Sequence, residues 1–291
     1  MTTRVSPSAI GALYWPNIVW FTLVHAMAVL ALCYIAVVHF SWATVGLATA
    51  LFFLCHIAIT AGSHRLYTHR AYKAARALQL FLLAFFSAVF QDSFLWWTAM
   101  HHRHHMYTDT ARDPHNIKRG FWWAHIGWLL HKPIMPNYLV EVRYLTRNKL
   151  VMFQHKYWGR LGILIGFVAP TVLASLWGDF LGGFLVGGFL RLMVQYHGTW
   201  IVNSVSHYIG PQPYGTKNSS RDSPWWLMLP AAILSVGEST RHNKHHWLPR
   251  DVCIGDRWYD IDPGKWFVIL CSWVGLAWDL KRFDDSGKVL A

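Results

Sequence analysis

The chain has 291 residues, of which 54% are hydrophobic and only 14% are charged. This balance is too apolar for an ordinary soluble domain, and the apolar residues are concentrated in long runs instead of being spread periodically. The formal net charge of +12 could attract nucleic acid, anionic lipid or an acidic protein, but the basic residues flank apolar runs and form no recognisable nucleic-acid-binding module. Composition therefore indicates a membrane protein and argues against a nucleic-acid partner.

The cysteines and the N-terminal segment give a second, weaker constraint. Cys33, Cys55, Cys253 and Cys271 are widely separated and show no CxxC or other metal-type spacing, so free thiols are expected and no disulfide framework. The N-terminal residues lack the basic-then-apolar pattern of a signal peptide. We therefore expect the functional face to lie in a reducing compartment.

Four apolar runs are long enough to cross a membrane, which takes about 20 residues for roughly 30 Å of hydrocarbon. They cover residues 17–38, 42–61, 161–177 and 180–203. The links within the first pair and within the second pair are only a few residues long. Each pair is therefore expected to form a helical hairpin.

Basic residues lie between the two hairpins and not in their short links. They are Arg65, Arg70, Lys73 and Arg76 after the first pair of runs, and Arg143, Arg147, Lys149, Lys156 and Arg160 before the second. The positive-inside rule places these segments in the cytoplasm, and two hairpins then leave both termini there as well. The predicted fold is a single all-α integral membrane domain, with four transmembrane helices in two hairpins and a cytosolic helical cap.

Two further apolar stretches, residues 77–97 and 266–280, are predicted to be interfacial helices. Gln91 and Asp92 interrupt the first, and a crossing there would place His64 and His69 on the opposite side from the histidines at 101–105. The second stretch is short for a membrane span.

Eighteen histidines occur in the chain, and three short segments hold half of them. The segments are SHRLYTHR with His64 and His69, HHRHH with His101, His102, His104 and His105, and HNKHH with His242, His245 and His246. On a helix that turns roughly 100° per residue, positions i, i+3 and i+4 share a face, so each H-x-x-H-H spacing groups three imidazoles. His64 and His69 stand about 140° apart on a straight helix, which suits a helix end that unwinds or ligation of two different ions.

Asn203 and His207 form a further pair, four residues apart at the end of the fourth run. By itself this pair could be helix packing or an interfacial polar pair. Nine histidines, eight from the three segments and His207, exceed the six positions of one octahedral ion, so the count implies two ions. Imidazole suits iron, copper, zinc and nickel, but an all-imidazole site for two ions at a membrane face favours redox chemistry with oxygen. Surface histidines or a structural zinc cluster are the competing interpretation.

Three carboxylates close to the second and third segments could orient ligand rings by accepting the N–H of the nitrogen that does not ligate. They are Asp109, Asp113 and Glu238. Helix capping or surface pairing with Arg112 and Arg241 is their competing role.

The flanks of these segments resemble the stearoyl-CoA (Δ9 acyl-CoA) desaturase family over residues 62–281. The similar stretches are SHRLYTHRAYKA, HHRHHMYTDTARDPHNIKRGFWWAHIGWLL, TWIVNSVSH, GESTRHNKHHWLPRD and IDPGKWFVILCSWVGLAWDLKR. Membrane hydroxylases share the histidine segments alone, whereas these flanks are more specific. The resemblance implies four spans, a cytosolic cap and cytosolic termini, in agreement with the count of apolar runs.

Carried over residue by residue, the resemblance implies a set of iron ligands and two tryptophans along an acyl tunnel, Trp97 and Trp200. The implied ligands are His64, His69, His101, His104, His105, His207, His242, His245 and His246, with Asn203 contacting iron through water. The chain departs from the family pattern at His102, where the family has arginine, so His102 is not counted as a ligand. It departs again where three residues, not two, separate Glu238 from His242, which puts the role of Glu238 in question.

The resemblance implies O2-dependent desaturation of a saturated fatty acyl chain, carried by CoA, with a cis double bond at Δ9 and two iron ions (Fe2+/Fe3+). Acid and base groups cannot remove hydrogen from an unactivated alkyl chain, so an oxidising iron–oxygen system is required. O2 takes four electrons to become two waters, and the substrate supplies only two. Because the chain has no iron–sulfur spacing, G-x-G-x-x-G or haem-binding domain, a separate ferredoxin, rubredoxin or cytochrome b5-like donor with its reductase is expected, docking on the basic face.

Two rival functions remain open from the sequence. A di-iron membrane hydroxylase of alkyl or lipid chains would share the histidine segments but add oxygen to the product. A metal transporter or sensor without catalysis would need ionisable residues along a path through the membrane, where only His25, His56, Arg191 and His197 stand out.

Overall fold

The computed structural model describes residues 11–132, 138–215, 217–255, 257, 260–284 and 286–290 and is mostly helical. The α-helices are α1 Trp15–Val37, α2 Trp42–Ile57, α3 Arg76–Ser87, α4 Phe94–Tyr107, α5 Phe121–His125, α6 Lys149–Ile163, α7 Ala169–Ser175, α8 Phe180–Gly182, α9 Arg191–Ser204, α10 Trp225–Ser235, α11 His242–Trp247 and α12 Pro263–Trp273. Three segments are π-helical: η1 Ala58–Thr68, η5 Leu164–Val168 and η6 Gly183–Leu190. Four are short 3-10 turns: η2 Ile117–Arg119, η3 Gly127–Leu130, η4 Tyr138–Val142 and η7 Val205–His207. Two strands, β1 Lys73–Ala74 and β2 Ala277–Trp278, pair antiparallel.

Within the described part of the chain, three helices are long and apolar enough to cross a membrane: Trp15–Val37, Trp42–Thr68 and Lys149–Ser175. They contain the whole second apolar run and all but the last one or two residues of the first and third runs. The fourth run, residues 180–203, is also helical, from Phe180 through η6 and α9 to Ser204. It is less apolar than the others because Arg191, Gln195 and His197 lie within it.

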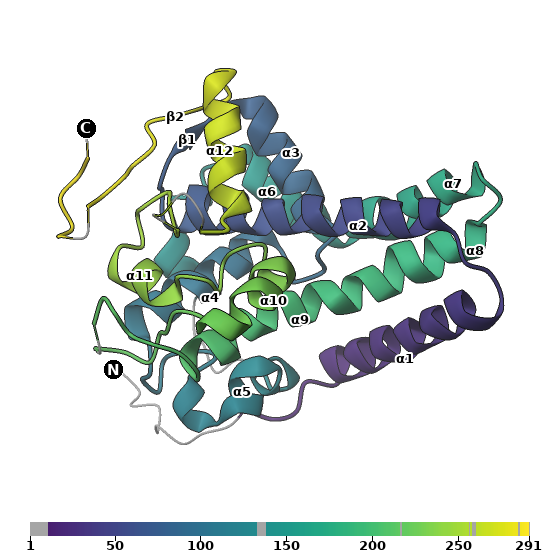
Figure 1. The fold of residues 1–291 in the computed structure, drawn as a ribbon, viewed down its shortest axis with the longest axis horizontal. Helices are drawn as coiled ribbons and strands as arrows, with labels where there is room; N and C mark the ends of the chain where they lie inside the picture. Colours follow the sequence, from purple (N-terminus) through teal and green to yellow (C-terminus); the bar gives the residue numbers. More distant parts are fainter. Residues whose placement is uncertain are drawn as a thin grey trace.

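The two hairpin turns, between α1 and α2 and between α7 and α8, lie at the same end of the helix bundle (Figure 1). The Asp179 carboxylate caps α8 by accepting a hydrogen bond from the backbone N–H of Gly182 at 3.0 Å. It also accepts from the Tyr34 hydroxyl of α1 at 2.6 Å and from the Thr44 hydroxyl of α2. One buried carboxylate therefore ties the first hairpin to the second.

Arg191 connects the second hairpin to α3 without a carboxylate partner among the described residues. Its buried guanidinium donates to the backbone carbonyls of Gly187, Gly166 and Ala88 at 3.2, 3.1 and 2.8 Å. Gly187 and Gly166 belong to the π-helical segments η6 and η5, and Ala88 ends α3. Arg191 thus satisfies carbonyl groups where the helices depart from regular α-helical bonding.

The two predicted interfacial helices differ from the observed ones. The stretch 77–97 is not one helix but two, α3 and α4, because the chain turns between them through Phe90 and Asp92, both with positive φ. Ser93 then caps α4, accepting from the backbone N–H of Trp96 at 3.2 Å. The predicted helix 266–280 ends at Trp273 in the structure, and the chain continues through Gly275 (φ 73°) into β2.

Helices α4, α5, α10 and α11 gather at the end of the bundle opposite the hairpin turns (Figure 1). The β1–β2 pair, with Lys73 opposite Trp278 and Ala74 opposite Ala277, holds the C-terminal segment beside the chain that follows η1. This arrangement brings the three histidine segments, on η1, α4 and α11, to one end of the molecule.

Candidate metal centre

The nine candidate ligand histidines come together and divide into two clusters. Cluster A consists of His64, His69, His101, His105 and His245, and cluster B of His104, His207, His242 and His246. Within each cluster the potential ligand atoms all lie within 4.8 Å of one another. The rings of His105 and His246 stack at 4.2 Å between centroids, so the two clusters adjoin.

The first histidine segment reaches cluster A through a π-helix. His69 N–H donates to the His64 carbonyl at 3.0 Å, which is the i→i+5 bond of a π-helix and brings residues five apart onto one side. The two rings consequently lie 4.8 Å apart. The sequence left open a helix end that unwinds or ligation of two different ions. The structure has a π-helical end, and His64 and His69 lie in the same cluster.

The second and third segments each serve both clusters. Helix α4 contributes His101 and His105 to cluster A and His104 to cluster B. Helix α11 does the reverse, with two histidines in cluster B and only His245 in cluster A. In both helices the i and i+4 positions share one cluster and the i+3 position turns to the other, so the H-x-x-H-H spacing supplies two adjacent sites.

Ring geometry within the clusters fits metal ligation. At a metal–nitrogen distance of about 2.1 Å, two ligands at right angles stand about 3.0 Å apart. The observed Nε2–Nε2 distances are 2.9 Å for His64–His245, 3.1 Å for His69–His101, 3.0 Å for His105–His245, 3.1 Å for His207–His242, 3.2 Å for His242–His246 and 3.3 Å for His104–His246. Burial, together with neighbouring imidazoles, lowers the pKa of rings such as His101, His105 and His246, which keeps them in the neutral form that binds metal.

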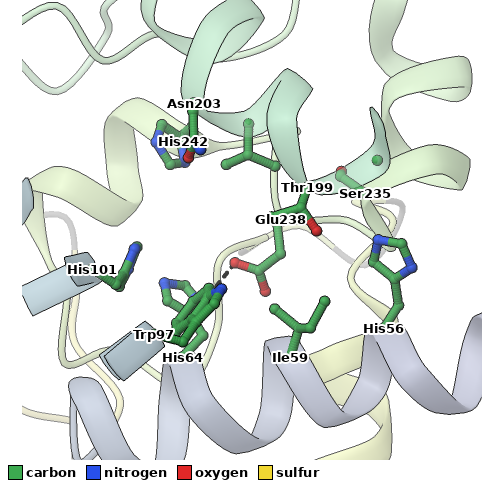
Figure 2. A pocket seen from close by; sticks show the side chains of 12 residues that line it. His56, Ile59, His64, Trp97, His101, Thr199, Asn203, Ser235, Glu238 and His242 are labelled. Atoms are coloured by element: carbon green, nitrogen blue, oxygen red, sulfur yellow. Dashed lines mark ion pairs between the residues drawn. The ribbon is translucent and has the colours of Figure 1, made fainter. Parts of the chain in front are cut away.

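A buried ion network supports cluster A. The Glu238 Oε2 atom lies 2.7 Å from His64 Nδ1 (Figure 2). Arg65 donates to Glu238 Oε1 at 2.6 Å and to Asp262 Oδ1 at 2.7 Å, and all three side chains are buried. Glu238 therefore reaches a cluster histidine despite the extra residue before the third segment. Arg241, its suggested competing partner, pairs instead with Asp260 at 2.9 Å.

Cluster B is supported by smaller contacts. Asp113 Oδ1 lies 2.9 Å from His104 Nδ1. The Ser219 hydroxyl lies 2.8 Å from His207 Nδ1 and donates to Asp109 at 2.5 Å. Asp113 thus contacts a cluster histidine directly, and Asp109 acts through Ser219. Burial raises the pKa of Asp113 to about 8.

Several supporting residues escaped the sequence reasoning. Arg65 follows His64 directly, but the sequence showed it only as a basic residue that indicates the cytoplasmic side. Asp262 lies 197 positions from Arg65, so no short motif connects the two. Ser219 belongs to a proline-rich stretch with no helical period. His115 was also missed, and it forms a group with His104 and Asp113 whose potential ligand atoms lie within 4.8 Å of one another. His102 belongs to neither cluster.

A pocket opens between the clusters and helices α2, α9 and α10. It is lined by His56, Ile59, His64, Trp97, His101, Gly198, Thr199, Val202, Asn203, Ser235, Glu238 and His242 (Figure 2). Trp97 stacks on His101 at 5.0 Å and donates to Gln91, whose amide donates in turn to Thr199 at 2.8 Å. Asn203 lines the pocket beside His242, whereas Trp200 does not line it and packs against Phe21 and Tyr196.

Residues 40–266 match the family described as fatty acid desaturase. The chain belongs to this family. It is 38% identical over 280 residues to a protein of Schizosaccharomyces pombe named "Probable acyl-CoA desaturase", which covers 94% of this chain and 57% of that protein. It is 40% identical over 233 residues to "Acyl-CoA desaturase 1" of Saccharomyces cerevisiae, covering 79% of this chain and 44% of the yeast protein. "Stearoyl-CoA desaturase 5" of Bos taurus is 35% identical over 288 residues, covering 96% and 84%.

Membership of the fatty acid desaturase family confirms the resemblance drawn from the histidine segments and their flanks. The chain spans about half the length of the two yeast relatives, and most of the bovine one. The family and the apolar helices together indicate that the chain is a membrane protein. Its two histidine clusters could hold metal ions.

Proposed function

We propose that this chain is an O2-dependent di-iron desaturase that introduces a cis double bond, at Δ9, into a saturated fatty acyl chain carried by CoA. The observation that carries the proposal is the pair of adjoining imidazole clusters opening onto one pocket. The names of the yeast and bovine relatives refer to acyl-CoA and stearoyl-CoA, which supports CoA as the carrier.

Cluster A and cluster B would each hold one iron ion. The nine histidines supply the ligands, and Asn203, beside His242 in the pocket wall, would contact the second ion through water. When bound, the two irons supply the oxidising power that, with O2, removes one hydrogen from each of two adjacent alkyl carbons. Among the residues that the structure describes, both clusters consist of histidines alone, which supports this assignment over a hydrolytic zinc pair, where carboxylates commonly join the imidazoles.

The chain's own residues bind and orient the substrate. Trp97, fixed by Gln91, presents its ring between His101 and the pocket, where it would contact the acyl chain near the reacting carbons. Glu238 and Asp113 hold the rings of His64 and His104 in place. Trp200, outside the pocket, would act by supporting α9 rather than by touching the chain there.

The two remaining electrons would come from a separate carrier, a ferredoxin, rubredoxin or cytochrome b5-like protein, with its reductase. In the described part of the chain all four cysteines are free and widely spaced, so they offer no iron–sulfur site. Four spans with the histidine end and both termini in the cytoplasm would present the basic segments to that carrier. Helices α4 and α11, which carry the second and third histidine segments, lie at the end of the bundle opposite the hairpin turns (Figure 1), and this supports the proposed topology.

Fatty-acid profiling of a desaturase-deficient host tests the proposal. Cells expressing the wild-type chain should gain a monounsaturated fatty acid, and cells expressing His104→Ala should not. His102→Ala is the matched control, since His102 lies in the same segment but in neither cluster, and it should retain the product. Hydroxylated lipid without a new double bond would contradict desaturation and favour a hydroxylase.

A further inference from the structure

The pocket carries a second histidine feature, away from the two clusters. His56 lies on α2 and is only 2% exposed, yet its side chain lines the pocket. Figure 2 shows its ring across the pocket from His101. His56 and His64 are eight residues apart in the sequence, His56 on α2 and His64 on the π-helix η1. Within the described residues, His56 belongs to neither cluster of candidate metal ligands.

The ring of His56 is held in one orientation. Its Nδ1 atom lies 2.6 Å from the Gln195 amide nitrogen. Its ring packs against Phe52 at a tilt of 51°, with 4.4 Å between ring centroids. The Nε2 atom, in contrast, is buried and has no hydrogen-bond partner among the residues that the structure describes. A buried polar atom of this kind is costly unless a ligand or water satisfies it.

Two hydroxyl groups that line the pocket already have hydrogen-bond partners. The Thr199 hydroxyl accepts from Gln91 at 2.8 Å and donates to the Gln195 carbonyl at 3.3 Å. The Ser235 hydroxyl donates to the Ala231 carbonyl at 2.7 Å. His56 Nε2 is thus a polar group left available at this side of an otherwise apolar wall that includes Ile59 and Val202.

Gly198 keeps the space beside this atom open. A Cβ atom at Gly198 would lie 3.0 Å from His56 Nε2 and 2.2 Å from the Leu234 carbonyl oxygen. Glycine therefore allows α9 to approach α10 closely without covering the imidazole. A metal ion is not the expected occupant, because within the described residues His56 belongs to no group of three potential ligands.

We propose that His56 Nε2 binds a hydroxyl group on the substrate's alkyl chain, several carbons from the carbons that react. This inference rests on the proposed function and adds a substrate class to it: hydroxylated acyl chains. A hydroxyl both donates and accepts, so it satisfies Nε2 in either tautomer of the imidazole. A plain methylene chain would bury Nε2 unpaired, and a site built for a hydroxyl discriminates against an analogue that lacks it.

Equilibrium binding to the purified, iron-loaded protein in detergent tests the inference. The ligands are saturated acyl-CoAs of one chain length, either plain or with a hydroxyl at successive positions. The wild type should bind one positional isomer at least about tenfold more tightly than the plain chain. Equal or weaker binding of every hydroxylated isomer would mean that a water molecule occupies the site, and would overturn the proposal.

Three variants with measured iron content make the test specific. His56→Leu removes both ring nitrogens, and His56→Asn keeps a partner for Gln195 but loses the group facing the pocket, so both should lose the tenfold preference. His56→Gln restores a polar group near the Nε2 position and should recover part of it. Preference that persists in His56→Leu and His56→Asn would contradict the role of His56.

Product analysis in the same samples separates this inference from the proposed function. Desaturation of the plain chain without any preference for a hydroxyl would overturn the inference alone. If the iron-loaded protein binds these ligands but desaturates none of them, the proposed function fails. In that case the comparison of binding between hydroxylated and plain acyl-CoAs still decides the inference about His56.

Discussion

Clusters A and B use the same ligand type but are built differently. Cluster A has five imidazoles, and cluster B has four, with Asn203 nearby in the pocket wall. An ion in cluster B would therefore have fewer protein ligands and more room for water or a reactant. The comparison suggests that cluster A serves to hold its ion and that cluster B provides the more open position.

The supports of the two clusters differ in charge. Glu238, which contacts His64 of cluster A, is paired with Arg65, which also pairs with Asp262. Burial raises the pKa of Glu238, and the Arg65 charge opposes that rise. Asp113, which contacts His104 of cluster B, is also buried but has no arginine or lysine partner among the described residues, and burial raises its pKa to about 8. Cluster A is thus the more preorganised of the two.

Removing one ligand from each cluster should have the largest effect and should separate the clusters. His246→Ala leaves cluster B with three imidazoles, and His245→Ala leaves cluster A with four. Both variants should lose at least about 100-fold in desaturation, because the proposed reaction requires both ions. Iron content should fall to about one ion per chain in His246→Ala and remain closer to two in His245→Ala. Equal iron loss in both would show that the clusters are equivalent.

Breaking the ion network of cluster A should mainly destabilise the fold. Arg65→Met leaves Glu238 and Asp262 as buried carboxylates without their shared partner. Loss of one partner from a buried network costs about 3–5 kcal/mol, and unfolding of the detergent-solubilised protein by denaturant would measure it. Arg103→Met is the control, since Arg103 pairs with Glu141 at 2.8 Å and, among the described residues, neither side chain forms an ion pair with a cluster histidine. A similar loss in the free energy of unfolding in both variants would contradict a larger stabilising role for Arg65 than for Arg103.

Weakening the support of cluster B should change metal affinity more than stability. Asp113→Asn keeps the shape of the side chain but cannot hold His104 as a carboxylate does. Loss of such an outer contact typically lowers metal affinity about 10–100-fold. Titration with a chelator should therefore remove one iron from the variant at lower chelator concentration than from the wild type, while the second iron resists equally in both. Simultaneous release of both ions would contradict independent clusters.

The sequence predicted which histidines would meet but not how they would divide. The i, i+3, i+4 spacing on α4 and α11 is local, so the grouping of each segment followed from helix geometry. The division depends on how α4 faces α11 and on the π-helix that brings His64 and His69 together, neither of which has a local signal. Contacts such as Arg65–Asp262, 197 positions apart, are invisible to a reading of short motifs.

The predicted hairpins were recognisable because apolar length is a strong signal. The prediction of one helix over residues 77–97 was wrong. Apolar residues continue through the stretch, but the backbone turns at Phe90 and Asp92 and divides it into α3 and α4. Ser93, which caps α4, is of a residue type that favours a helix start, but Ser87 and Asp92 in the same stretch are too, so residue type alone did not locate the break.

The smallest expected effect concerns the indirect support of cluster B through Ser219. Ser219→Ala removes the hydroxyl between His207 Nδ1 and Asp109, but the backbone N–H of Ser219 still donates to Asp109 at 2.7 Å, so the loop should stay in place. The His207 ring then loses one neutral hydrogen bond, which contributes about 0.5–1.5 kcal/mol and so about tenfold at most in the affinity of cluster B for iron. Chelator titration should place Ser219→Ala between the wild type and Asp113→Asn. An effect as large as that of Asp113→Asn would mean that Asp109 and Asp113 contribute equally, and that the direct contact with His104 has no advantage over the relay through Ser219.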